Sequence, residues 1–92
     1  MEPSHPGAII QEFYLEELGI TMTDIAKAIG VSPSTIGRIV NEKAAVTPDM
    51  AIKLSQVLSG SPESWLQLQM NYDLWHAEAR NENLQLKSLV PA

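Results

Sequence analysis

Apolar residues recur at helical spacing along most of the chain, and capping residues separate one helical stretch from the next. A first helix is expected to begin near Pro6 or Gly7, after an irregular proline-rich start, and to end at Gly19. Its predicted inward side consists of Ile10, Phe13, Tyr14 and Leu18, with Glu12 and Glu16 on the other side. This stretch is the first of five expected helices.

The most informative pattern is a pair of short helices joined by a tight glycine turn. Thr21 is expected to cap the first of these helices together with Asp24, and Gly30 to end it in a left-handed conformation. Ser32 then caps a second helix that begins at Pro33, where the missing amide proton does no harm. This arrangement is a helix-turn-helix. Its predicted buried residues are Ile25, Ala26, Ile29, Val31, Ile36, Ile39 and Val40.

The helix that begins at Pro33 is predicted to turn polar side chains outward, as a DNA-reading helix does. Arg38 is the main candidate for reading sequence, since a guanidinium can donate two parallel hydrogen bonds to guanine. Asn41 and Lys43 suit contacts to DNA phosphates. Thr23, near the start of the preceding helix, suits a contact to the DNA backbone on the other flank of the reading helix. The predicted DNA-binding set is Thr23, Ser32, Ser34, Thr35, Arg38, Asn41 and Lys43. The open alternative is a helix pair that never touches nucleic acid.

Two more helices are expected after a loop at 41–46. The fourth covers 48–58 and is capped by Thr47, and the fifth covers about 62–80 and is capped by Ser61. The apolar stripe of the fourth helix is Met50, Ala51, Leu54, Val57 and Leu58.

The predicted fifth helix has apolar residues on two opposite faces. One face comprises Trp65, Leu68, Tyr72, Trp75 and Ala79, and the other comprises Leu66, Met70, Leu74 and Ala77. Because a terminal helix of so small a chain can bury one face on its own domain, the other is expected to meet a partner chain. A homodimer interface is therefore assigned to Trp65, Leu66, Met70 and Leu74. The alternative is that Leu66, Met70 and Leu74 fold under the preceding helix while the tryptophan stripe is partly exposed.

These elements predict a single all-α helix-turn-helix domain over residues 1–80, with the fifth helix for dimerisation, followed by a tail over 81–92. Leucines at 84 and 86 alternate with polar residues, as in a strand that could join a partner's sheet. A loose terminus is the favoured interpretation.

Charge is unevenly distributed along the chain. The net charge of −5 divides into −4 for residues 1–20, +1 for residues 21–60 and −2 for residues 61–92. The middle part contains the helix-turn-helix and is the only part that DNA would not repel. Because a single copy would bind weakly, two copies on one duplex are the expected working unit.

No arrangement of residues suggests catalysis, a cofactor or a metal site. Cysteine is absent, which excludes disulfides, thiolate metal ligands and a cysteine nucleophile. His5 is expected in a flexible arm and His76 at a surface or interface, and neither has a second ligand at suitable spacing. The chain has no nucleophile motif and no glycine-rich phosphate loop. A non-enzymatic protein is therefore predicted.

The sequence also bears on location. No apolar run approaches the roughly 20 residues needed to cross a bilayer, and the N-terminus lacks the pattern of a secretory signal. The expected location is the cytoplasm, without membrane attachment.

The order of these segments resembles the lambda-repressor-like, or Xre, helix-turn-helix family and, more narrowly, the HigA-type antitoxins of bacterial toxin–antitoxin pairs. The matching segments span nearly the whole chain to about residue 80 and comprise 5–7, 18–21, 26–32, 47–51, 61–69 and 72–74. The resemblance implies a five-helix domain that dimerises and binds double-stranded operator DNA upstream of its own genes. It also implies a partner toxin, a small RelE-like ribonuclease that cleaves mRNA. The acidic first third suits such a basic partner.

The chain departs from the family where glutamines often contact DNA. It carries Met22 at one such position and small hydroxyl residues early in the third helix. Individual base contacts therefore do not carry over from the family, whereas the docking mode does. Three functions remain open: an antitoxin that represses its own operon, a stand-alone or phage-type repressor without a toxin, and a protein-interaction module that has kept the fold without DNA binding.

Overall fold

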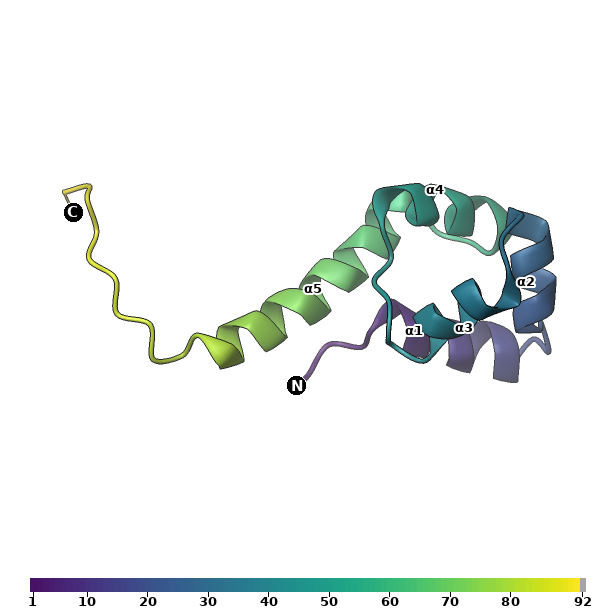
Figure 1. Cartoon of the computed structure of the whole chain (residues 1–92), viewed down its shortest axis with the longest axis horizontal. Helices are drawn as coiled ribbons and strands as arrows, with labels where there is room; N and C mark the ends of the chain where they lie inside the picture. Colours follow the sequence, from purple (N-terminus) through teal and green to yellow (C-terminus); the bar gives the residue numbers. More distant parts are fainter. Residues whose placement is uncertain (92) are drawn as a thin grey trace.

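Five helical segments form the domain, and the fifth projects away from the other four (Figure 1). The computed structural model describes residues 1–91, and this part of the chain contains helices and no strands. The helices are α1 (Pro6–Ile9), which continues directly as the π-helix η1 (Ile10–Glu16), then α2 (Met22–Ile29), α3 (Pro33–Val40), α4 (Pro48–Val57) and α5 (Pro62–Arg80). The predicted all-α, five-helix fold is confirmed.

Local capping signals place the helix boundaries where the sequence predicts them. Thr21 and Asp24 form a complete capping box, in which the Asp24 carboxylate accepts the Thr21 N–H at 2.9 Å and the Thr21 hydroxyl accepts the Asp24 N–H at 3.0 Å. The Thr21 N–H also holds the pKa of Asp24 below its usual value. Gly30 ends α2 with a φ of +89°, a left-handed conformation that glycine adopts at little cost. The caps at Ser32, Thr47 and Ser61 are likewise confirmed.

His5 is the buried N-cap of α1, so the expectation of a flexible arm is wrong. Its side chain is 3% exposed, and its Nδ1 accepts the Gly7 N–H at 2.8 Å. The ring also meets Tyr72 of α5 edge-on, with ring centroids 4.9 Å apart. Burial lowers the pKa of His5. The negative charges of Glu42 and Asp73 raise it, but by less than burial lowers it. Histidine is not among the common capping residues, so the sequence gives little sign of this role.

Gly7 lets α1 approach the backbone of α3 directly. A Cβ atom on Gly7 would lie 1.9 Å from the carbonyl oxygen of Ile39 and 3.0 Å from the Cα of Val40. The first helix therefore supports the C-terminal half of α3 through backbone contact, which only a residue without a side chain allows.

The π-helical register of η1 changes which side chains face the core. Phe13 is 47% exposed and Leu18 is 64% exposed, so their predicted burial is wrong. Wider i→i+5 hydrogen bonds, such as that from the Glu17 N–H to the Glu12 carbonyl at 3.3 Å, rotate the helix relative to an α-helix. Ile10 is buried instead, and Tyr14 and Leu15 pack against the core beside it.

The core lies between α1 to α4 and the first turns of α5. Its buried apolar members are Ile10, Ile25, Ala26, Ile36, Ile39, Val40, Val46, Ala51, Leu54 and Trp65. Most of the predicted stripes of α2, α3 and α4 are thus confirmed as core. Val57 is the exception in α4, because it is 36% exposed at the edge of that helix.

Trp65 belongs to this core, so its assignment to a dimer interface is wrong. Its side chain is 3% exposed, and its indole Nε1 donates to the Ser59 carbonyl at 2.8 Å. The Tyr14 ring lies beside it, with ring centroids 6.3 Å apart. The first turns of α5 lie on the domain, and only later turns project from it (Figure 1). A periodicity argument treats all turns of a helix alike and so misses this difference.

Candidate nucleic-acid interface

A cluster of hydroxyl groups covers the N-terminus of α3. The Ser32 hydroxyl accepts the Thr35 N–H at 3.4 Å, and its Oγ lies 3.0 Å from both the Ser34 Oγ and the Thr35 Oγ1. Ser32 and Ser34 are exposed, and Thr35 is half-buried. Backbone N–H groups and the helix dipole make this end of α3 electropositive. Short hydroxyl side chains here can donate to a phosphate or to a base edge.

The outward face of α3 carries Ser34, Arg38 and Asn41, which are all exposed. Ile36 and Ile39 hold the opposite face in the core. Within residues 1–91, no carboxylate lies at ion-pair distance from Arg38. The donors of this exposed guanidinium are therefore open to solvent.

The chain leaves α3 through a Schellman motif that positions Lys43. The Lys43 N–H donates to the Arg38 carbonyl at 2.8 Å, and the Glu42 N–H donates to the Ile39 carbonyl at 3.0 Å. Glu42 has a φ of +61°, a position that favours glycine. The motif holds the exposed Lys43 just beyond the last turn of α3.

The start of α2 lies against the middle of α3. Thr23 is exposed in the first turn of α2, next to Met22, which is 37% exposed. The Met22 Sδ lies 3.7 Å from the point where a Cβ on Gly37 would stand. Met22 and Gly37 therefore border the predicted contact set, although neither is part of it. A search for hydrogen-bond donors does not select an apolar side chain or a glycine.

Six of the seven predicted DNA-contact residues therefore lie on α3 or at its two ends, and Thr23 lies on the adjoining α2. All seven side chains are exposed or half-buried. The structure thus presents one polar surface built around α3, with a hydroxyl cluster at one end, Arg38 in the middle and Lys43 at the other.

A second surface, an apolar groove, runs along α5. Its volume is about 530 Å³, and its lining residues are Leu66, Gln69, Met70, Asp73, Leu74 and Ala77. Met70 is 53% exposed and Leu74 is 54% exposed, so both are free to meet a partner. Leu66 is partly buried against the core at the near end. The alternative in which Met70 and Leu74 fold under α4 is wrong.

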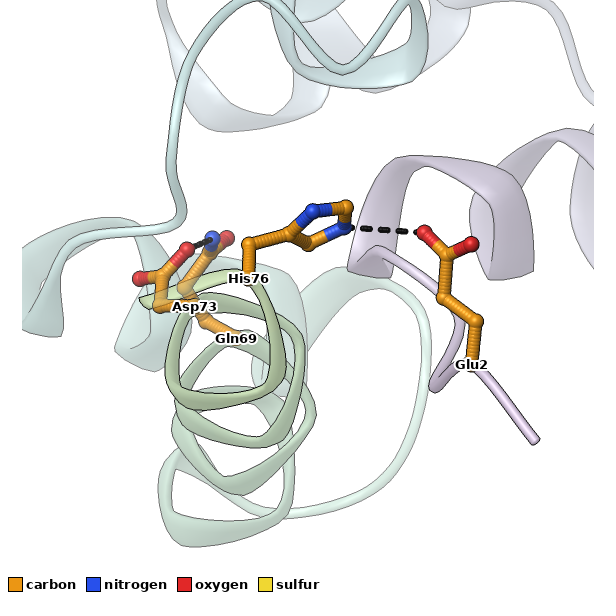
Figure 2. A network of polar contacts seen from close by, with 4 residues as sticks. All are labelled: Glu2, Gln69, Asp73 and His76. Atoms are coloured by element: carbon orange, nitrogen blue, oxygen red, sulfur yellow. Dashed lines mark hydrogen bonds and ion pairs between the residues drawn. The ribbon is translucent and has the colours of Figure 1, made fainter. Parts of the chain in front are cut away.

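Gln69 forms a polar base for this groove that the sequence analysis missed. Its carbonyl oxygen accepts the Val46 N–H at 2.8 Å. Its amide donates to the Asp73 carboxylate at 2.9 Å, as Figure 2 shows. The side chain is 6% exposed. Both polar ends of the amide therefore have hydrogen-bond partners, as buried polar groups generally do. The bond to Val46 connects the loop before α4 to α5.

The N-terminal segment braces the projecting part of α5. The Glu2 carboxylate lies 2.8 Å from the His76 Nε2 (Figure 2). The His76 ring packs against Tyr72, with centroids 4.3 Å apart, and against Trp75 at 5.2 Å. His76 therefore lies at a partly exposed surface, as predicted, and links the first residues of the chain to the arm.

Comparison with known proteins bears on what these surfaces do. A family model described as helix-turn-helix matches residues 12–66, which include α2 and α3. A relative from Escherichia coli strain K12, the uncharacterized HTH-type transcriptional regulator YddM, is 46% identical over 85 residues, covering 92% of this chain and 89% of the relative. The chain belongs to the helix-turn-helix family.

Solved structures place this helix-turn-helix protein beside the HigA-type antitoxins. The antitoxin GraA in complex with its operator has a TM-score of 0.89 and 37% identity, covering 99% of this chain and 95% of that chain. The Pseudomonas aeruginosa antitoxin HigA with the higBA promoter has a TM-score of 0.88 and 34% identity, covering 97% of this chain and 100% of that chain. The family resemblance seen in the sequence is confirmed.

Two further findings describe what this helix-turn-helix protein does not contain over residues 1–91. No helix there combines the length and apolar character needed to span a membrane. No group of three or more histidine, aspartate or glutamate side chains there is placed to hold a metal ion.

Proposed function

We propose that the protein is a sequence-specific DNA-binding antitoxin that works as a homodimer in the cytoplasm and has no enzymatic activity. It represses its own operon and neutralises a RelE-like, mRNA-cleaving toxin. The observation that carries the DNA-binding part is the exposed polar face of α3, where Arg38 has no acidic partner within residues 1–91. The two related antitoxin structures named above, GraA in complex with its operator and HigA with the higBA promoter, support the same assignment.

Each α3 would enter the major groove with Arg38 toward the bases. Ser32 at one end of the helix and Lys43 at the other would contact phosphates, which fixes the register of the helix on the duplex. Ser34 and Thr35 would add contacts to base edges or phosphates. Because the net charge is −5, this local set of donors has to supply the attraction that the whole molecule lacks.

Dimerisation through α5 would place two α3 helices on one face of the duplex. The groove formed by Met70, Leu74 and their neighbours on the arm is the proposed contact between the two copies. Two half-sites one helical turn apart require the reading helices to stand about 34 Å from each other. The predicted operator is therefore close to palindromic.

A gel-shift titration with the DNA fragment upstream of the gene tests DNA binding. At fixed salt, Arg38→Ala should cost about 1–3 kcal/mol at each half-site, so loss of both copies from the dimer should weaken binding by at least roughly 30-fold. Arg80→Ala removes the same side chain from the end of α5 and should leave affinity nearly unchanged. Equal affinity for Arg38→Ala and the wild-type protein would show that α3 is not the reading helix.

Charge supports the toxin-binding part of the proposal. Residues 1–20 carry four glutamates and no lysine or arginine. An enzyme that binds mRNA needs a basic surface, and opposite charges speed encounter between two proteins. Co-expression with the product of an adjacent reading frame tests this part, since an antitoxin should restore growth that the neighbouring protein inhibits.

The second candidate is a repressor without a toxin. The relative YddM favours it, because its name describes a transcriptional regulator only. The two candidates differ in gene context: an antitoxin has a short neighbouring gene for a basic protein, and a stand-alone repressor has none.

A further inference from the structure

The outward face of the first helix has the character of a protein-docking surface. We propose that Phe13 and Leu18, with the glutamates around them, form the surface that binds a small basic protein. This inference rests on the proposed toxin neutralisation and assigns that activity to a place on the molecule.

The exposure of two large apolar side chains is the first observation. Phe13 is 47% exposed and Leu18 is 64% exposed, although α-helical periodicity predicts both on the buried side. Phe13 lies within η1, and Leu18 lies two residues beyond its end at Glu16. Both apolar side chains therefore lie outside the core, at positions where α-helical spacing predicts burial.

The π-helix is itself the second observation. Such helices are rare and are frequently found at functional sites. Here the π-helix continues α1 for seven residues from Ile10 to Glu16. It is anchored on the inner side by Tyr14, whose hydroxyl hydrogen-bonds to the Ser59 hydroxyl. The unusual backbone of η1 is therefore held in place by the core, and Phe13 on this segment is exposed.

Charge identifies the occupant as a basic protein. Glu12, Glu16 and Glu17 are exposed beside Phe13 and Leu18, and the first lysine or arginine in the chain is Lys27. This surface repels DNA and a second acidic copy of the chain. An apolar centre with a charged rim is the usual composition of a specific protein interface. A basic partner would pair with the rim while its apolar residues cover Phe13 and Leu18.

The surface uses none of the residues proposed for the other two contacts. DNA contacts are assigned to α2, α3 and the loop after α3, and the dimer contact is assigned to α5. The three proposed contacts are therefore distinct, and each can be tested by substitutions outside the other two.

Binding of the purified basic protein encoded next to the gene tests the surface, with calorimetry on the full-length chain. The double variant Phe13→Ala/Leu18→Ala should bind about 10- to 30-fold more weakly, as expected for loss of apolar anchors. Ile52→Ala is the matched control, because Ile52 is also 47% exposed but lies on α4. It should change affinity by less than about twofold.

Charge is tested separately by association kinetics. Glu12→Gln/Glu16→Gln should slow association with the same protein several-fold at low salt and much less at high salt. Glu63→Gln/Glu82→Gln removes the same charge from outside the first helix and should have the smaller effect. Equal effects of the two pairs would show that only net charge matters, which would overturn the assignment to η1.

The possible failures are distinguishable. If the wild-type chain binds the neighbouring protein and the Phe13/Leu18 variant binds equally well, the surface is wrong and toxin neutralisation stands. If the wild-type chain does not bind it, both proposals fall. Operator binding and thermal unfolding of each variant check the fold. Hydrogen exchange of the wild-type complex provides a readout without mutation: protection of residues 10–18 supports the proposal, and protection confined to other segments overturns it.

Discussion

The contact between Gly7 and α3 gives the sharpest test of how this domain is built. In Gly7→Ala the new Cβ would stand 1.9 Å from the Ile39 carbonyl oxygen, a distance at which α1 and α3 have to separate. The clash involves backbone atoms on a core helix, so no side chain can move to relieve it. Gly37→Ala is the matched control, because its Cβ would meet only the Met22 Sδ, at 3.7 Å.

The two substitutions should change stability in opposite directions. Overpacking of this kind costs about 3 kcal/mol, and the greater helix propensity of alanine returns no more than about 1 kcal/mol. The net loss of about 2 kcal/mol for Gly7→Ala corresponds to a fall in Tm of roughly 8–16 °C for a domain of this size. Gly37→Ala replaces a glycine in the middle of a helix with a better helix former, so it should raise the free energy of unfolding by up to about 1 kcal/mol.

Thermal unfolding followed by far-UV circular dichroism measures both effects. Wild type and variants should be compared at one protomer concentration, since a dimer's Tm depends on concentration. A Tm of Gly7→Ala within about 2 °C of the wild-type value would show that α1 and α3 are not in direct backbone contact at Gly7. A lower Tm for Gly37→Ala than for Gly7→Ala would contradict the same contact.

Three further predictions concern acid, backbone strain and the arm. The lowered pKa of His5 means that the unfolded chain binds the proton more readily, so stability should fall as pH drops below about 6.5, with a slope of at most about 1.4 kcal/mol per pH unit. His5→Asn keeps a capping side chain and should flatten this part of the pH profile in urea titrations, and an unchanged slope would contradict the assignment. Glu42→Gly should raise the free energy of unfolding by about 1 kcal/mol, since glycine adopts the φ of +61° without strain, and a loss of stability would show that the Glu42 side chain contributes more than its backbone costs. Met70→Asp/Leu74→Asp should give monomers in sedimentation with an unchanged circular dichroism spectrum, whereas Ile52→Asp should not, and a persistent dimer would exclude the α5 groove as the interface.

Much of this fold could be predicted because its signals are local. Ser32, Thr47 and Ser61 each precede a proline, and a cap followed by proline depends on only a few neighbouring residues. The left-handed turn at Gly30 is equally local. Boundaries and the helix-turn-helix therefore follow from short stretches of sequence.

The errors arise where tertiary contacts decide. Phe13 and Leu18 follow α-helical spacing, but the backbone takes a π register that no residue type announces. His5 caps a helix from a position where the chain looks flexible, because Tyr72 covers its ring from 67 positions along the sequence. Trp65 and Leu74 lie in one helix, yet only Trp65 meets the core.

The candidate DNA surface shows the same division. Exposure of Arg38 follows from the burial of Ile36 and Ile39, which the spacing already predicts. The Schellman motif that places Lys43 depends on a left-handed Glu42, which sequence statistics disfavour. The proximity of Met22 to Gly37, beside the predicted contact set, depends on how α2 packs against α3.

The projecting shape of α5 would make it a lever as well as the proposed contact between two copies. The part of α5 from Trp65 to its end at Arg80 is about 22 Å long, so a tilt of about 10° at Trp65 moves the far tip by roughly 4 Å. That displacement is a sizeable part of the roughly 34 Å repeat that a paired protein has to match on the duplex. Residues far from the nucleic acid, including Glu2 and His76 at the brace, would thereby tune which spacing of half-sites is accepted.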